Sequence, residues 1–121
     1  MKQREFEDLV REAVQALPAF FLDIMVNVDV QVRRRPTKRQ LSRTKLEPGE
    51  TLMGLYEGIP LTQRVEYNLV EPDIITVFKE PIEEACATPE QVREQVRQTV
   101  VHEVAHFFGI TDPELEAWGV Y

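Results

Sequence analysis

The hydrophobic positions in the first part of the chain repeat with two different periods. Over Gln3–Leu17 they recur at helical spacing, and charged residues occupy most positions between them. Pro18 interrupts this pattern, and Ala19–Met25 follows as a short helical turn that contains two phenylalanines. Over Val26–Arg33 every second residue is valine and the others are polar, which predicts a strand with one buried face. The chain is therefore expected to begin with a helix, a short helical turn and a strand.

Two further strands and one long helix complete the expected elements. Thr51–Glu57 is a short segment bounded by glycine and proline, and Ile74–Phe78 is an apolar run typical of a buried strand. Thr88 is the expected N-cap of the last helix, proline follows at the first helical position, and the Gln91 side chain would complete a capping box. These signals predict a helix over Pro89–Phe108.

Together these elements predict an α+β fold. The N-terminal helix and the last long helix would pack on a small mixed sheet of three to four strands. With 121 residues the chain has room for one hydrophobic core and not for two, so we expect residues 1–121 to form a single domain.

Composition and charge narrow the classes of partner and the compartment. A net charge of −7 argues against broad binding to nucleic acid or to an anionic membrane, both of which need a basic surface. The N-terminus lacks the apolar run of a signal peptide, and no apolar stretch approaches the length of a membrane span. The single cysteine, Cys86, cannot form an internal disulfide, which is typical of a reducing compartment. We therefore expect a cytoplasmic protein, and a monomer, although the sequence does not fix the oligomeric state.

One stretch opposes the acidic balance of the chain. Arg33–Lys45, called here the basic stretch, contains seven of the fourteen basic residues. It has two interpretations: a contact site for an acidic substrate or RNA, or a mobile, solvated loop. The acidic remainder of the chain favours the solvated loop.

Both histidines of the chain lie near the end of the last predicted helix, with a glutamate after the first. His102 and His106 are four residues apart, so they lie about 40° apart on one helix face. Two imidazoles held in this way can bind one Zn²⁺, and Glu103 at the edge of the same face can reach a water on the metal. Gly109 can end the helix in a left-handed turn that brings Asp112 back as a third ligand.

The residues around this motif favour a metal over the alternatives. Most of the helix circumference in its last two turns is apolar: Val100, Val101, Val104, Ala105, Phe107 and Phe108. Burying two histidines and a carboxylate without partners is costly, and a metal would satisfy all three. The alternatives are a solvent-facing polar stripe, or two core histidines bonded to main-chain carbonyls. Asp112 has an alternative role as a helix cap beside Thr111 and Glu114, in which case Glu116 is the substitute ligand.

The pattern His-Glu-x-x-His-x-x-Gly-x-x-Asp resembles the motif of a family of small bacterial zincin-like metallopeptidases, minimal domains in which Asp replaces the usual third histidine of metzincins. Leu52–Pro60 also resembles a stretch that this family carries upstream of the helix. The resemblance implies that the α+β fold is a minimal zincin-like domain. It also implies a hydrolase that cleaves peptide bonds, a metallopeptidase with Zn²⁺ as its cofactor. It assigns the metal ligands to His102, His106 and Asp112, and the general base to Glu103.

The resemblance also implies how a peptide or protein substrate would bind. In zincins the edge strand beside the active-site helix pairs with an extended substrate, and Gly54–Glu57 is the matching segment here. A purely structural strand is the alternative. The oxyanion stabiliser is left open among Tyr56, Tyr67 and Tyr121, each of which could instead be a packing residue. All three methionines precede the motif, so a methionine turn below the metal is not expected.

Two other functions remain open at this point. Metal-dependent endoribonucleases of the ribosome-maturation type share the spacing from His106 to Asp112, but they lack an acid at the position of Glu103. A non-catalytic binding module stabilised by a metal would instead have a closed site with four ligands. Peptide deformylase also contains the two-histidine motif, but its cysteine ligand lies in a distinct upstream motif. Cys86, between two alanines, is typical of a small buried residue.

Overall fold

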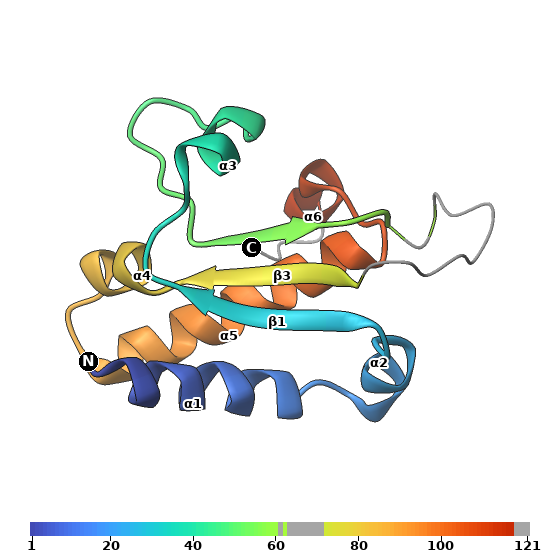
Figure 1. Cartoon of the computed structure of the whole chain (residues 1–121), viewed down its shortest axis with the longest axis horizontal. Coiled ribbons are helices and arrows are strands. Elements are labelled where there is room, and N and C mark those ends of the chain that lie inside the picture. The colour runs from blue at the N-terminus through green and yellow to red at the C-terminus, as the bar shows by residue number, and fades with distance from the viewer. Residues whose placement is uncertain (61, 63–71, 118–121) are drawn as a thin grey trace.

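The structure is a computed structural model, and its described residues are 1–60, 62 and 72–117. Within them the chain forms six helices and one three-stranded sheet (Figure 1). In chain order the elements are α1 (Gln3–Gln15), α2 (Ala19–Ile24), β1 (Val28–Arg33), α3 (Lys38–Arg43), β2 (Gly54–Glu57), β3 (Asp73–Phe78), α4 (Lys79–Ala85), α5 (Pro89–Phe107) and α6 (Asp112–Ala117). None of the described helices has the length and apolarity needed to cross a membrane.

The sheet is mixed, with strand order β1-β3-β2. β1 runs parallel to β3, with Val28 opposite Asp73, whereas β2 runs antiparallel to β3, with Gly54 opposite Val77. β3 is buried at every position except Ile74, as expected for a central strand whose two faces are both covered. The predicted α+β fold with a small mixed sheet is therefore confirmed, with three strands.

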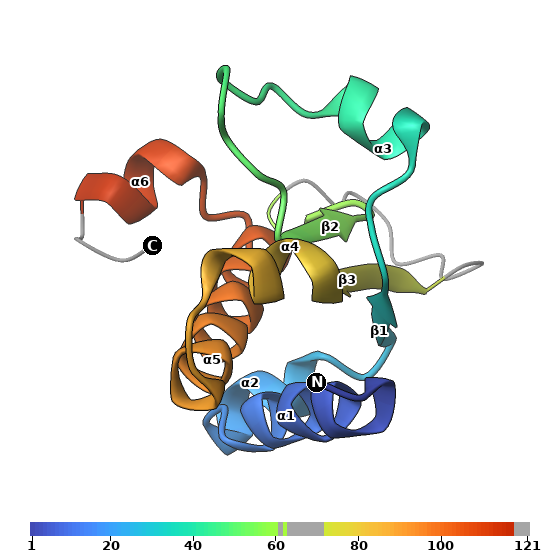
Figure 2. The same cartoon turned by 90° about the vertical axis from the view of Figure 1, so that its left-hand side faces the viewer.

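Helices α1 and α5 pack side by side against one face of the sheet, whereas α3 and α6 lie at the end of the molecule away from α1 (Figures 1 and 2). The periodic apolar positions of both helices supply the core, since Phe6 of α1 and Val96 of α5 are fully buried against Ile75 of β3. A buried side chain of this size contributes about 1.5–3 kcal/mol relative to an exposed one. This packing fixes α5, whose C-terminal turns carry both histidines.

The start of α5 matches its sequence signals in part. The Thr88 hydroxyl accepts a hydrogen bond from the Gln91 backbone N–H at 3.2 Å, which confirms the predicted N-cap. The Gln91 side chain, however, accepts from the backbone N–H of Ala87 at 2.6 Å, not from that of Thr88. The reciprocal half of the predicted capping box is therefore wrong, because the side chain extends one residue further back along the chain.

Helix α4 was not expected, since the sequence signals only ended the preceding strand. It follows β3 without a loop, and Pro81 lies buried in its first turn. A proline is tolerated there because the backbone N–H groups of the first turn have no partner within the helix.

The basic stretch is not the unstructured loop that its composition favoured. Its middle forms α3, which begins with a complete capping box: the Thr37 hydroxyl accepts from the Gln40 backbone N–H, and the Gln40 side chain accepts from that of Thr37. The Gln40 amide also donates to the Glu57 carboxylate at 3.1 Å, which links α3 to β2.

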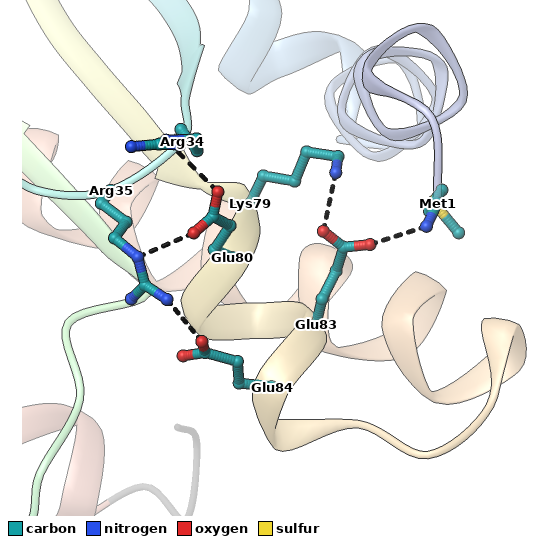
Figure 3. Close-up of polar contacts among 7 residues, drawn as sticks. All are labelled: Met1, Arg34, Arg35, Lys79, Glu80, Glu83 and Glu84. Atoms are coloured by element: carbon teal, nitrogen blue, oxygen red, sulfur yellow. Dashed lines mark hydrogen bonds and ion pairs between the residues drawn. The ribbon is translucent and has the colours of Figure 1, made fainter.

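The start of the same stretch is held by α4 through ion pairs (Figure 3). The Arg35 guanidinium pairs with Glu80 at 2.7 Å and also with Glu84, and Arg34 pairs with Glu80 at 3.3 Å. Each exposed pair contributes little alone, but together they fix the direction in which the chain leaves β1.

Candidate metal centre

The two imidazole rings lie edge to face at the end of α5, with centroids 4.5 Å apart. The Nε2 atoms of His102 and His106 lie 2.9 and 2.8 Å from the same oxygen, Oδ1 of Asp112. All three residues can offer a ligand atom within 4.8 Å of the others. The structure thus brings together the three side chains that the sequence predicted as metal ligands, and the partners of both rings are carboxylates.

The return of the chain after α5 depends on Gly109. Its φ of +85° lies in the left-handed region, and its N–H donates to the carbonyl of His106 at 2.9 Å. Ile110 N–H donates to the carbonyl of Ala105 at the same distance, which closes the helix end in the way that a glycine turn allows. The predicted left-handed turn is confirmed, and it reverses the chain so that Asp112 lies over the histidines.

The alternative role of Asp112 as a cap is taken by its neighbours. The Glu114 carboxylate accepts from the Thr111 backbone N–H at 3.3 Å and from the Thr111 hydroxyl at 3.0 Å. Asp112 itself is the first residue of α6, and its carboxylate faces the two histidines. Glu114 therefore caps the start of α6, which leaves the Asp112 carboxylate to face the histidines.

Glu103 lies buried beside the three residues, with 5% of its surface exposed. Its Oε1 atom is 3.2 Å from Nδ1 of His106. Within the described residues no buried side-chain nitrogen or oxygen lacks a partner, so the carboxylate is compensated even without a metal.

The ionisation of the metal-free site follows from these contacts. The hydrogen bond with Glu103 raises the pKa of His106 to about 9, although burial opposes this, and Asp112 adds to the rise. Burial alone would raise the pKa of Asp112, but the hydrogen bond and charge of His106, with a contribution from His102, hold it below its usual value. At neutral pH His106 is therefore an imidazolium that donates from Nδ1 to Glu103 and from Nε2 to Asp112. A metal ion would replace the proton on the ring nitrogen that binds it.

A cavity of about 470 Å³ opens over these residues. One wall is formed by the chain from Thr44 to Leu55, which includes the first half of β2, and the other by α5 with Asp112 and Glu116. Among the described residues only the two histidines and Asp112 gather as metal-ligating groups. Three protein ligands beside a cavity leave a coordination position open to a water or a substrate, whereas a structural zinc site has four. The donor set of two imidazoles and one carboxylate therefore fits a catalytic zinc ion.

Other residues that the sequence singled out lie apart from this centre. The Tyr56 hydroxyl donates to Asp73 at 2.6 Å, so this phenol is bonded within the sheet and is not a lining residue of the cavity. Cys86 is half-buried, and burial raises the pKa of its thiol, as expected for a packing residue. Glu116 lines the cavity without joining the ligand group. Tyr67 and Tyr121, the other predicted phenols, lie outside the described residues.

Gly54 was predicted as part of the edge strand, but its close approach to α5 was not. Gly54 begins β2 beside α5, and a Cβ atom there would lie 2.5 Å from Cγ2 of Thr99 and 3.2 Å from Cγ of Glu103. A glycine at a strand end can mark such a close approach, but the sequence alone does not say what approaches it.

Comparison with known protein families shows which family the chain belongs to. The family described as zincin-like metallopeptidase matches residues 25–120. The chain belongs to this family. The matched residues of this zincin-like protein include the whole sheet and the histidine helix, so the expected family membership is confirmed. Membership in this family implies a metal, typically zinc.

The fold is also found in a solved structure. A conserved hypothetical protein from T. thermophilus is similar, with a TM-score of 0.55 and 18% sequence identity. The similarity covers 98% of this chain and 97% of that protein, so the two share the fold over their whole length. Comparison with curated proteins gives no match.

Proposed function

We propose that this zincin-like protein is a zinc-dependent peptidase whose metal is held by His102, His106 and Asp112. The convergence of both Nε2 atoms on one carboxylate oxygen, with Glu103 beside them, is the observation that carries the proposal. When bound there, zinc supplies Lewis acidity, which polarises a substrate carbonyl and makes hydroxide available near neutral pH.

In this proposal Glu103 is the general base. Its carboxylate accepts a proton from the attacking water and later returns it to the departing amine of the cleaved peptide bond. Burial removes competing solvent from the carboxylate, and its position one residue after His102 keeps it on the metal side of α5. The hydrogen bond to His106 holds its orientation.

The proposed substrate is a peptide or protein in extended form, held along the outer edge of β2. Gly54 and Leu55 line the cavity, and in the described part of the chain β2 pairs on one side only, with β3. The outer edge of a strand can pair with an extended peptide through backbone N–H and C=O groups, which bind it without demanding particular side chains.

The test compares three variants for zinc content and for cleavage of a peptide library. Glu103→Gln is expected to keep zinc and to lose cleavage by about a hundredfold or more, because the base is removed and the ligands are kept. His106→Ala is expected to lose both. Glu116→Gln, which also lines the cavity but lies outside the ligand group, is the matched control and is expected to keep both.

Either of two results would overturn the proposal. In the first, Glu103→Gln cleaves peptides at the parental rate with zinc bound. In the second, the zinc-loaded parent cleaves single-stranded RNA and no peptide, which would support the endoribonuclease alternative. Zinc binding with neither activity would support a binding module.

A further inference from the structure

The structure divides the cations of the basic stretch into two groups. Arg34 and Arg35 are paired with carboxylates of α4 (Figure 3). The others are exposed and have no acidic partner within the described part of the chain: Arg33, Lys38, Arg39, Arg43 and Lys45. The first group anchors the stretch, and the second is available to a ligand.

Two leucines interrupt the unpaired cations. Leu41 and Leu46 retain 40% and 37% of their surface exposed, so apolar surface lies among these cations. We call the exposed side chains of this surface the α3 face, which consists of Lys38, Arg39, Leu41, Arg43, Lys45 and Leu46.

The α3 face continues directly into the wall of the metal-site cavity. Thr44, Lys45 and Leu46 line that cavity together with His102 and Asp112. Figures 1 and 2 show α3 on the same side of the molecule as α6, with the following chain leading to the start of β2. A polypeptide that lies along β2 would therefore meet the α3 face with the residues on one side of its scissile bond.

We propose that the α3 face binds acidic, partly apolar polypeptide and so selects substrates with Asp or Glu to one side of the scissile bond. No acidic residue lies between Asp29 and Glu47, so this part of the chain carries +7 while the remainder carries −14, and five of its seven cations are not paired with α4. Such a separation of charge attracts an acidic ligand to one place and repels it elsewhere. The two leucines add contact area for apolar side chains between the acids. The inference rests on the proposed function, because it treats the bound polypeptide as the substrate.

An acidic polypeptide fits this surface better than RNA does. No aromatic residue lies between β1 and Tyr56 to stack on bases, and Glu50 and Glu116 on the cavity walls would repel a phosphate backbone.

The test measures binding separately from cleavage. The zinc-loaded Glu103→Gln protein is titrated into a fluorescein-labelled peptide of about twelve residues that carries four acids to one side of its centre, and into its Asn/Gln analogue. We expect at least about tenfold tighter binding of the acidic peptide, with the difference falling as salt is raised. Arg43→Glu/Lys45→Glu added to this protein should abolish the preference. Lys2→Glu/Arg4→Glu makes the same change of charge on and beside the exposed face of α1 and should keep it.

The outcomes are distinct for this inference and for the proposed function. Equal binding of the two peptides, or equal loss in both double variants, overturns the inference, as does tighter binding of single-stranded RNA of the same length. If the parent cleaves acidic and neutral peptides at equal rates, the proposed function stands and the inference fails. If it cleaves neither but the charge-dependent binding persists, the peptidase proposal fails and the α3 face remains a binding surface. If the Arg43→Glu/Lys45→Glu protein unfolds at a lower temperature than the parent, Lys45→Gln alone is tested instead, and it must weaken binding of the acidic peptide about twofold or more.

Discussion

The contact between β2 and the histidine helix can be tested by adding one methyl group, with Gly54→Ala. The new Cβ would lie 2.5 Å from Cγ2 of Thr99, about 1 Å closer than two carbon atoms normally approach. Thr99 is 6% exposed and lies one turn before Glu103, so the strain must move β2 away from α5 or displace the base itself. Overpacking of this kind costs about 1–3 kcal/mol of stability. A displacement of about 1 Å at the base would lower kcat/KM by about a hundredfold.

The assay combines denaturant unfolding with kcat/KM on the zinc-loaded protein and includes a rescue. Thr99→Ser removes Cγ2 but keeps the hydroxyl that accepts from Gln95 at 3.3 Å, so it should cost little alone and should restore the Gly54→Ala protein toward the parental values. If Gly54→Ala only lowered stability and left Glu103 in place, Thr99→Ser would not raise kcat/KM. If Gly54→Ala is as stable and as active as the parent, the close approach has no role in positioning Glu103.

Three further predictions concern protonation and backbone geometry. Because the pKa of His106 is raised to about 9 in the metal-free protein, zinc binding at pH 7 should release about one proton, and zinc affinity should rise as pH rises toward 9. Calorimetry in buffers of different ionisation enthalpy measures the number of protons released, and a release of zero would contradict the prediction. Gly109→Ala should lose about 1–3 kcal/mol in denaturant unfolding, and zinc affinity with it, since φ is +85° there; an unchanged midpoint would contradict the turn geometry. Burial alone would raise the pKa of Glu83, but hydrogen bonds from Lys79 and the N-terminal ammonium lower it below its ordinary value. The Glu83 carboxylate therefore stabilises the fold above its ordinary pKa, and this stabilisation is lost as pH falls through the lowered pKa. Glu83→Gln should flatten the acid side of the Tm-against-pH curve, and an unchanged curve would contradict this.

Periodicity and motif spacing were enough to predict the parts of the fold that depend on local signals. The alternating valines of β1 and the cap at Thr88 are such signals. The strand and the helix that they predict start and end within two residues of the observed bounds. The gathering of Asp112 with the histidines was also accessible, because Gly109 marks a turn whose geometry is nearly fixed.

The features that were missed depend on contacts between distant parts of the chain. α3 is held through Gln40 to β2 and, at its preceding residues, through Arg35 to α4, and neither partner can be identified from the basic stretch itself. α4 is a short helix that begins where a strand ends, and Pro81 reads as a strand terminator unless its place in the first turn is known. The importance of Gly54 appears only when Thr99 of α5 is brought against it.

The most direct test of the account is zinc-edge X-ray absorption on protein produced with zinc and purified without a chelator or a metal-affinity tag. The account predicts one zinc per chain, coordinated by two imidazole nitrogens and by oxygen donors at about 2.0–2.2 Å, with no sulfur. The His106→Ala protein should lose this signal. Zinc absent from the parent protein, a sulfur ligand in the shell, or an unchanged spectrum in His106→Ala would contradict the account.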